Sequence, residues 1–209
     1  MVDTEVESVA AGLERFLQER IFRDLERGRS TDKEHTALVV DKIKKIVRNS
    51  PDLDVDLDVL LIAAYAHDWG YADLFENKLP LSLAEIGKNK DTHMLIGAKK
   101  LTELLRDPFF DFLTDMQKER AVHLVGAHDK LADLKDVDEL ILMEADTLGG
   151  LEPDVMGVFE YEESEVRFMQ KNRDKRFVIF VTDYGKREYE RLFQKRQEFF
   201  MEHKNRVKK

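Results

Sequence analysis

The sequence predicts an all-α protein, a single-domain helical bundle over residues 1–209, and three observations support that prediction. Apolar residues recur mainly at intervals of three and four, the period of an amphipathic helix. Only 4 Pro and 10 Gly occur in 209 residues, which argues against turn-rich sandwich and barrel folds. Several segments also begin with residue pairs that cap helix N-termini. The length suffices for one substantial core, burying roughly 70% of the unfolded surface, rather than for two large domains.

The N-terminal region predicts two amphipathic helices in succession. Residues about 4–27 follow helical spacing, and Gly28 is expected to end that helix. Thr31 and Glu34 have the spacing of a capping box, which opens a second helix over about 32–48.

A buried helix is expected next. Pro51 and the acidic stretch 52–58 separate the preceding helix from residues 59–66, which are apolar on every face. Eight such residues would also fit a buried strand, but the alanines and the lack of nearby turn signals favour a fully buried helix. Gly70 suits the glycine position that follows many helix C-termini.

The middle of the chain is predicted to alternate between irregular stretches and capped helices. Residues 71–90 look irregular, with a short capped turn at 82–85. Three further helix starts are expected: Asp91 caps a helix over about 92–105, a Thr114–Gln117 capping box opens one that reaches about 129, and an Asp136–Glu139 segment opens one that reaches about 148. Gly149, Gly150 and Pro153 are expected to break the chain.

A C-terminal helical extension over about 154–209 is expected to follow a core of about 31–150. Residues 154–172 look helical, and 186–205 form a charged amphipathic pattern. The apolar, β-prone stretch at 177–182 is expected to be irregular, a short strand or a buried turn of helix. The basic residues of the tail are interpreted mainly as solvated, with a phosphate or partner contact as the alternative.

Composition excludes several classes of protein. The hydrophobic fraction of 43% argues against disorder, and zero Cys excludes disulfides, iron–sulfur clusters and thiolate zinc sites. The net charge of −9 argues against nucleic acid as the main partner. No stretch approaches the roughly 18 apolar residues of a membrane helix, and the N-terminus lacks the pattern of a secretory signal. We therefore expect a cytoplasmic protein with no membrane segment.

An ordered set of histidines and aspartates is the strongest chemical signal. Its members are His35, His67, Asp68, His93, His128 and Asp146. Successive members are separated by about one helix plus one connection, so the helices of a bundle can bring them to one point. Imidazole and carboxylate ligands suit divalent Mn, Fe, Co, Ni or Zn.

Asp68 is central to that interpretation. An unpaired carboxylate after a fully apolar helix would cost several kcal/mol, and a cation would relieve that cost. An ion pair between Asp68 and a histidine, or Asp68 capping the next turn, explains the residue equally well. Chemistry alone therefore leaves these alternatives open.

The same residues resemble the HD superfamily of metal-dependent phosphohydrolases. The segment AAYAHDWG, residues 63–70, is similar to the central motif of that family, and the order His35, His67-Asp68, Asp146 is similar to its H…HD…D pattern. Three further segments resemble members with two extra histidines: HMLIGA at 93–98, VHLVGAH at 122–128 and EADTL at 144–148. The resemblance covers about residues 31–150 and implies an HD-type helical bundle.

The resemblance implies a role for each residue of the set. The four-ligand metal site of the family corresponds to His35, His67, Asp68 and Asp146, and the two extra histidines correspond to His93 and His128. Asp68 would bridge two metals, and Asp68 with His67 would be the catalytic centre. The implied cofactors are one or two divalent ions, with Mn, Fe, Co, Ni, Mg and Zn as candidates.

Two other histidines and a second HD dipeptide are assigned other roles. His123 is the alternative to His128 as a ligand, but the two are offset by about 140° on a helix, and the family context favours His128. Asp129 after His128 is interpreted as part of a solvated helix end. His203 lies in the basic tail and is expected at the surface.

Substrate contacts are expected from Lys100, Arg106 and Tyr71, although each also fits an ordinary surface or core role. Several cations lie near the predicted ligands in sequence: Lys88, Lys90, Lys99, Lys100, Arg106 and Lys130. Trp69 is a further candidate for the pocket wall. Glu144 lies two residues before Asp146, a helical spacing that points it elsewhere.

The predicted function is hydrolysis of a phosphate ester of a small molecule, with a nucleotide among the candidate substrates. A di-iron oxygenase of the same fold and a non-catalytic ligand-binding or sensor module are the alternatives. A homodimer through the first and last helices is compatible with their amphipathic faces.

Overall fold

The computed structural model describes residues 11–29, 31–75, 83–159 and 161–207. The predicted first helix is present from residue 11 to residue 25. It includes a π-helical turn, η1 (Gln18–Phe22), which continues directly into α2 (Arg23–Leu25). The part of that prediction over residues 4–10 lies outside the described residues. The described helices confirm the all-α fold class.

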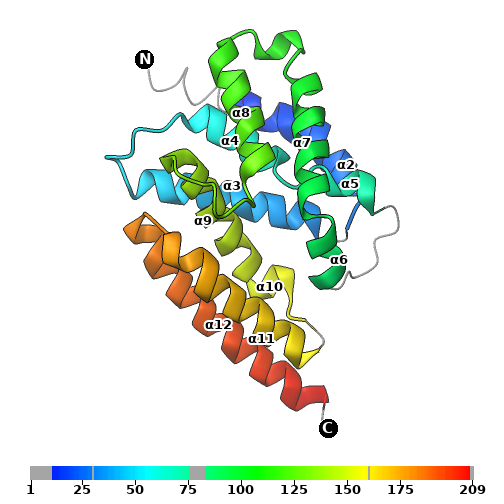
Figure 1. Ribbon diagram of the computed structural model, residues 1–209, viewed down its shortest axis with the longest axis vertical. Coiled ribbons are helices and arrows are strands. Elements are labelled where there is room, and N and C mark those ends of the chain that lie inside the picture. Colours follow the sequence, from blue (N-terminus) through cyan, green and yellow to red (C-terminus); the bar gives the residue numbers. More distant parts are fainter. Residues whose placement is uncertain (1–10, 30, 76–82, 160, 208–209) are drawn as a thin grey trace.

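Two helices, α3 (Asp32–Arg48) and α9 (Val137–Leu151), pack against each other in the middle of the molecule (Figure 1). The predicted break at Gly149 and Gly150 is wrong, because α9 runs through both glycines. A Cβ atom on Gly149 would lie 3.1 Å from Val39 Cγ2 and 3.4 Å from the His35 ring. Gly149 therefore serves the close approach of α3 and α9 rather than a chain break.

The apolar run after residue 58 forms the predicted buried helix, α4 (Leu57–Ala66). Every residue from Val59 to Ala66 is buried, and the Asp56 side chain caps the helix by accepting the Val59 amide at 3.1 Å. The helices α3, α8 and α9 surround it. Because residues 59–66 are buried on every face, the chain that leaves the C-terminus of α4 begins inside the protein.

The α7 (Lys90–Leu104) and α8 (Asp115–Ala127) helices form a neighbouring pair at one end of the molecule (Figure 1). The Thr114–Gln117 capping box of α8 is confirmed. The α7 helix begins earlier than predicted, with Asn89 at its N-cap and Asp91 inside its first turn. Short elements fill the preceding and following connections: α5 (Tyr71–Leu74), α6 (Leu83–Lys88) and η2 (Pro108–Phe110). The predicted cap Ser82 lies outside the described residues.

The predicted capping box at the start of α3 is absent. Thr31 stands at the N-cap position but makes no side-chain capping hydrogen bond. The neighbouring Asp32 instead accepts hydrogen bonds from the backbone N–H of Arg29 at 3.2 Å and from Arg29 Nε at 2.5 Å. The interaction of Asp32 with Arg29 is therefore found where the sequence predicted a capping box between Thr31 and Glu34.

The C-terminal region is helical but more interrupted than predicted. Its elements are α10 (Pro153–Met156), α11 (Glu162–Lys171), η3 (Asn172–Arg176), η4 (Phe177–Ile179) and α12 (Asp183–Val207). Gly157, with a positive φ of 65°, follows α10 and separates it from α11. The strand alternative at 177–182 is wrong, since residues 177–179 form a 3-10 turn and the described chain contains no strand.

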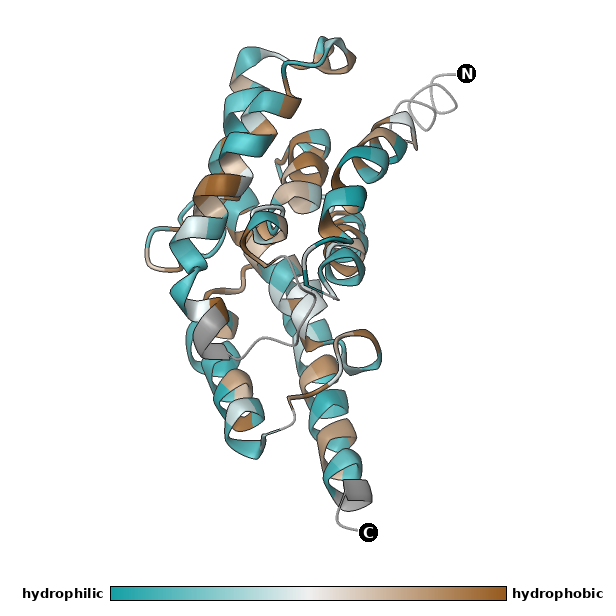
Figure 2. Cartoon of the chain, turned by 90° about the vertical axis from the view of Figure 1, so that its right-hand side faces the viewer, coloured by the Kyte–Doolittle hydropathy of each residue, from teal (hydrophilic) through white to brown (hydrophobic). Residues whose placement is uncertain are grey.

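Buried ion pairs attach α12 to the rest of the protein. Lys42 on α3 donates to Glu188 at 2.9 Å, and Arg196 donates to Glu165 on α11 at 2.5 Å and to the Gly150 carbonyl at 3.1 Å. Figure 2 shows hydrophilic and hydrophobic bands alternating along the helix that ends at the C-terminus. That pattern matches a helix with one face on the core. No helix of the described chain is both long and apolar enough to cross a membrane.

Replacing Glu188 with Gln is expected to make the protein less sensitive to acid. Hydrogen bonds from Arg191 and Lys42 lower the pKa of Glu188 from 4.5 to about 2. A lowered carboxyl pKa stabilises the fold above pH 4.5, and this stabilisation disappears as the pH falls toward about 2. The gap in unfolding free energy between wild type and Glu188→Gln should therefore close over that interval, measured by urea denaturation. Glu190→Gln, at an exposed site on the same helix, is the control, and an equal gap at all pH values would contradict the assignment.

Candidate metal centre

The structure brings all six residues of the predicted set together. They come from four helices and the segment after α4: His35 from α3, His67 and Asp68 from the end of α4, His93 from α7, His128 from the end of α8 and Asp146 from α9. The imidazoles are buried almost completely, with side-chain exposures between 0 and 7%. Asp68 and Asp146 keep 11 and 15%. Solvent therefore reaches the cluster from the carboxylate side.

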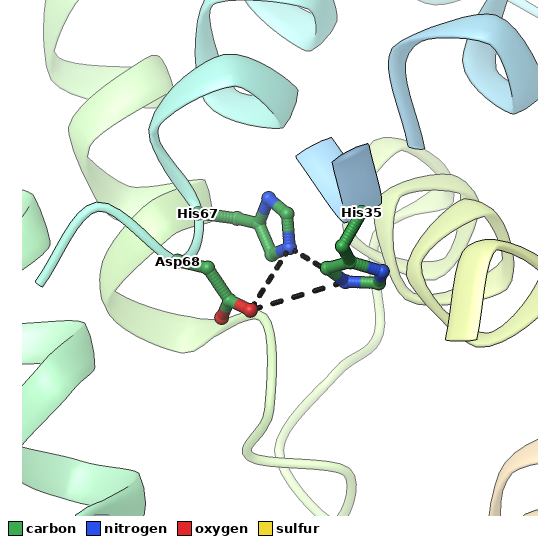
Figure 3. A group of neighbouring side chains, drawn as sticks. All are labelled: His35, His67 and Asp68. Atoms are coloured by element: carbon green, nitrogen blue, oxygen red, sulfur yellow. Dashed lines mark hydrogen bonds and ion pairs between the residues drawn. The ribbon is translucent and has the colours of Figure 1, made fainter. Parts of the chain in front are cut away.

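The first group of candidate ligands consists of His35, His67 and Asp68 (Figure 3). The two Nε2 atoms of the histidines lie 3.3 Å apart. Asp68 Oδ2 lies 3.6 Å from His67 Nε2 and 3.9 Å from His35 Nε2. Asp146 Oδ1 lies beside the same two histidines, at 3.0 Å from His35 Nε2 and 3.8 Å from His67 Nε2.

The second group consists of Asp68, His93 and His128. The Nε2 atoms of His93 and His128 again lie 3.3 Å apart. Asp68 Oδ1 lies 3.4 Å from His93 Nε2 and 3.7 Å from His128 Nε2. The two carboxylate oxygens of Asp68 thus face different groups, one oxygen to each.

Backbone carbonyls orient three of the four imidazoles. His67 Nδ1 lies 2.8 Å from the Ala64 carbonyl, and His128 Nδ1 lies 2.8 Å from the Val125 carbonyl. His93 Nδ1 is 3.3 Å from the carbonyl of Asn89. A carbonyl only accepts hydrogen bonds, so each Nδ1 carries the proton and each Nε2 presents its lone pair to the cluster. The same arrangement orients histidines that bind metals.

The protonation of each histidine pair is unequal in the metal-free chain. Burial lowers the pKa of His67, and it lowers the pKa of His93 to about 4. Burial also lowers the pKa of His35 and His128, but the hydrogen bond of His35 with Asp146 and the nearby carboxylate of Asp68 at His128 outweigh it and raise both values. In the pair His35–His67 the His67 ring is the more easily neutral one, and in the pair His93–His128 it is the His93 ring. The other ring of each pair retains a proton more readily.

Both carboxylates of the cluster are strongly acidic. Burial raises the pKa of Asp68, but His67, His128 and Arg29 outweigh it and hold that pKa well below the usual range. Burial also raises the pKa of Asp146, and the charge of Arg176 together with His35 lowers it far more.

This donor set fits a divalent cation. Two imidazoles whose Nε2 atoms face each other at 3.3 Å repel through their lone pairs unless a proton or a cation lies between them. Ionised carboxylates and neutral imidazoles are the ligands that Mn, Fe, Co, Ni and Zn prefer. A metal would take the place of the shared protons and release them, as metal binding to histidine generally does.

Two arginines that the sequence analysis did not single out contact the cluster. Arg176, from η3, donates to Asp146 Oδ2, to Asp129 Oδ1 at 2.9 Å and to Thr147 Oγ1 at 2.7 Å. Arg29 donates to Asp68 Oδ2 at 3.0 Å. The sequence position of Arg29, shortly before His35, was the one feature that could have indicated its role. No feature of the sequence pointed to Arg176.

The prediction that Asp129 belongs to a solvated helix end is wrong. Its side chain is only 19% exposed, and it pairs with Arg176 at 2.9 Å and with Lys90 at 4.0 Å. Burial raises the pKa of Asp129, but the charges of Arg176 and His128 lower it by more than burial raises it. The net pKa is below the usual value, so the carboxylate is ionised. A second HD dipeptide thus places its histidine in the cluster and its aspartate beside it.

The predicted substrate contacts divide between the cluster and the surface. Tyr71 is buried and stacks on the His93 ring, with the centroids 4.0 Å apart. Lys100 instead pairs with Asp73 at 2.7 Å and Asp24 at 3.1 Å. Arg106, 70% exposed, pairs with Glu103.

The other candidates lie outside the cluster. His123 is 52% exposed and is paired with Glu139 at 2.6 Å, and it lines a surface groove of about 560 Å³ together with Arg106. Glu144 points away from the ligands and accepts hydrogen bonds from Thr182 Oγ1 at 2.5 Å and the Thr182 amide at 3.0 Å. Trp69 donates to Asp24 at 3.0 Å, and His203 is exposed.

Comparison with known proteins gave one match. The sequence model of the HD domain family matches residues 33–150. Comparisons with curated proteins and with solved structures found no match. The matched range contains all six clustered residues and neither Arg29 nor Arg176.

Proposed function

Because the chain belongs to the HD domain family, whose members are generally metal-dependent hydrolases, we propose that it hydrolyses a phosphate ester of a small molecule. The observation that carries this proposal is the orientation of Asp68. Its Oδ2 faces the first histidine pair and its Oδ1 faces the second. One carboxylate could therefore serve two adjacent cations, and a pair of adjacent cations is typical of phosphatases and nucleases.

We assign the ligands by these groups. His35, His67, Asp68 and Asp146 would hold one ion, and Asp68, His93 and His128 the other. When bound, the ions supply Lewis acidity and lower the pKa of a coordinated water from about 15.7 toward 7.

The residues of the chain have a positioning role in this proposal. The Ala64 and Val125 carbonyls keep His67 and His128 in the tautomer that presents Nε2. Arg176 holds Asp146, which also accepts a hydrogen bond from His35 at 3.0 Å. Ligands that are already held in place cost no reorganisation energy during the reaction. Such preorganisation is usually the largest contribution to electrostatic catalysis.

The direct test combines elemental analysis of the protein, purified without chelator, with a panel of phosphate mono- and diesters that includes nucleotides. We expect about two equivalents of a divalent metal, as a two-metal site requires, and phosphate release that a chelator stops. Bound iron with oxygen uptake and no ester hydrolysis would instead support the oxygenase alternative. Absence of metal and of turnover after addition of Mn or Ni would favour a binding module.

Replacing both His93 and His128 with Ala is expected to remove one metal equivalent and leave the other. Among the described carboxylates, these two histidines pair only with Asp68, through its Oδ1, whereas the first group keeps His35, His67 and Asp146. Inductively coupled plasma analysis of the loaded variant measures the change, and His123→Ala is the control because His123 lies outside the cluster. Unchanged stoichiometry would show that the second group holds no ion.

A further inference from the structure

Arg29 is held beside the cluster by contacts that do not depend on Asp68. Its backbone N–H and its Nε both donate to the buried Asp32, at 3.2 and 2.5 Å. Its guanidinium carbon lies 3.9 Å from the centroid of the Tyr71 ring. Tyr71 in turn stacks on His93. An aromatic platform and a carboxylate therefore fix the plane of the guanidinium.

The outer end of the guanidinium still has donors to spare. A guanidinium carries five N–H groups, and within the described chain the side chain of Arg29 makes hydrogen bonds only through Nε to Asp32 and through Nη2 to Asp68 Oδ2. Nη1 therefore makes no hydrogen bond to a described residue. The Arg29 side chain is 15% exposed, and the Asp68 carboxylate that it contacts is 11% exposed.

We propose that Arg29 binds a phosphoryl oxygen of the substrate at the metal centre. This inference rests on the proposed function and adds a residue outside the range that matches the HD domain family. Arginine presents parallel N–H donors that match the oxygens of a phosphate, and it remains charged at every relevant pH. Asp68 Oδ2 is the atom that Arg29 contacts and also one of the candidate metal ligands. A phosphate bound at that point lies within reach of the free donors.

A purely structural role for Arg29 makes a different prediction. If Arg29 only neutralised Asp32 and Asp68, its removal would change stability or metal content but not the recognition of phosphate. Asp32 is 1% exposed, so loss of its partner is expected to lower stability in either case. A measurement of phosphate binding at full metal occupancy therefore distinguishes a phosphate-binding role of Arg29 from a purely structural one.

The test uses full-length protein loaded with Mn²⁺, in wild-type form and as Arg29→Ala. Titration calorimetry measures the affinity for inorganic phosphate, and elemental analysis confirms equal metal content. We expect phosphate affinity and kcat/KM to fall by roughly 10- to 100-fold, as for the loss of a hydrogen bond between charged groups. Guanidinium ion at a non-denaturing concentration should restore part of both in Arg29→Ala. Arg27→Ala is the matched control, because Arg27 is 71% exposed and pairs only with Asp24 among the described residues.

A second variant covers the case in which Arg29→Ala does not fold. Arg29→Lys keeps a positive charge beside Asp32 but lacks the planar fork, so we expect it to fold, to bind phosphate less tightly than wild type and to show no rescue by guanidinium.

The possible outcomes are distinct. Wild-type phosphate affinity in either variant at full metal content would overturn the inference, and so would a loss of metal that accounts for the whole effect. A Mn-loaded wild type that neither binds phosphate nor hydrolyses any ester would overturn the proposed function itself.

Discussion

Replacing Asp68 with Asn is expected to remove both metal ions and to lower turnover by roughly 10⁴-fold, the scale of losing one member of a catalytic unit. Asp68 is the only carboxylate shared by the two candidate groups in the described chain. Asparagine keeps the shape of the side chain but offers each group a neutral atom in place of an anionic oxygen. A cation bound among the imidazoles would then lack the negative charge of the Asp68 carboxylate.

Elemental analysis and ester hydrolysis measure the two effects of Asp68→Asn separately. Asp52→Asn, at an exposed position with no contact to the cluster, is the control and should behave as wild type. Loss of activity with two metal equivalents retained would mean that Asp68 acts on the substrate rather than on the ions. Retained activity would contradict the metal mechanism.

Much of the site was predictable because its ligands are tied to helix positions. Each clustered histidine or aspartate lies on a helix or at its end, and helical periodicity is readable from the sequence. The order of the residues and the buried character of α4 indicated that such side chains meet, and the resemblance to the HD superfamily favoured His128 over His123 as the sixth member. Chemistry alone left an ion pair between Asp68 and a histidine as an alternative to a metal site. The structure places the Asp68 oxygens 3.4 to 3.9 Å from four histidine Nε2 atoms and adds a pair with Arg29 that was not predicted.

The arginines could not be predicted in the same way, because their contacts depend on tertiary packing. Arg29 and Asp68 are separated by 39 residues, and Arg176 and Asp146 by 30. Arg176 lies between the predicted helix 154–172 and the stretch 177–182, where no structure was predicted, and its side chain reaches the cluster through the packing of η3 against α9. The C-terminal extension thus contributes directly to the geometry of Asp146.

Glycines were misread for a related reason. A glycine signals a chain break or a left-handed residue when only local geometry is considered. Gly70 was expected at the glycine position after a helix C-terminus, but it lies beyond the C-cap His67 and has φ −65° and ψ −24°, which is ordinary right-handed backbone. What requires glycine at this position is another helix: a Cβ atom on Gly70 would lie 2.0 Å from the His93 carbonyl oxygen and 2.9 Å from the Gly97 amide nitrogen.

Gly70→Ala is therefore expected to displace α7 and to disrupt the second group of ligands. The clash involves backbone atoms, which cannot rotate away as a side chain can, so we expect a loss of about 3 kcal/mol in unfolding free energy, the upper range for overpacking. His93 moves with α7, and its 3.4 Å separation from Asp68 Oδ1 should increase. Urea denaturation and metal analysis should show lower stability together with the loss of one metal equivalent.

The matched control for this substitution is Gly87→Ala. Gly87 is exposed on α6, and a Cβ atom there would have no neighbour within 4 Å. Alanine is also the better helix former, so Gly87→Ala should be neutral or slightly stabilising. If Gly70→Ala kept wild-type stability and two metal equivalents, the contact between α7 and residue 70 would not position His93. A loss of stability with both ions retained would separate the packing of α7 from the geometry of the metal centre.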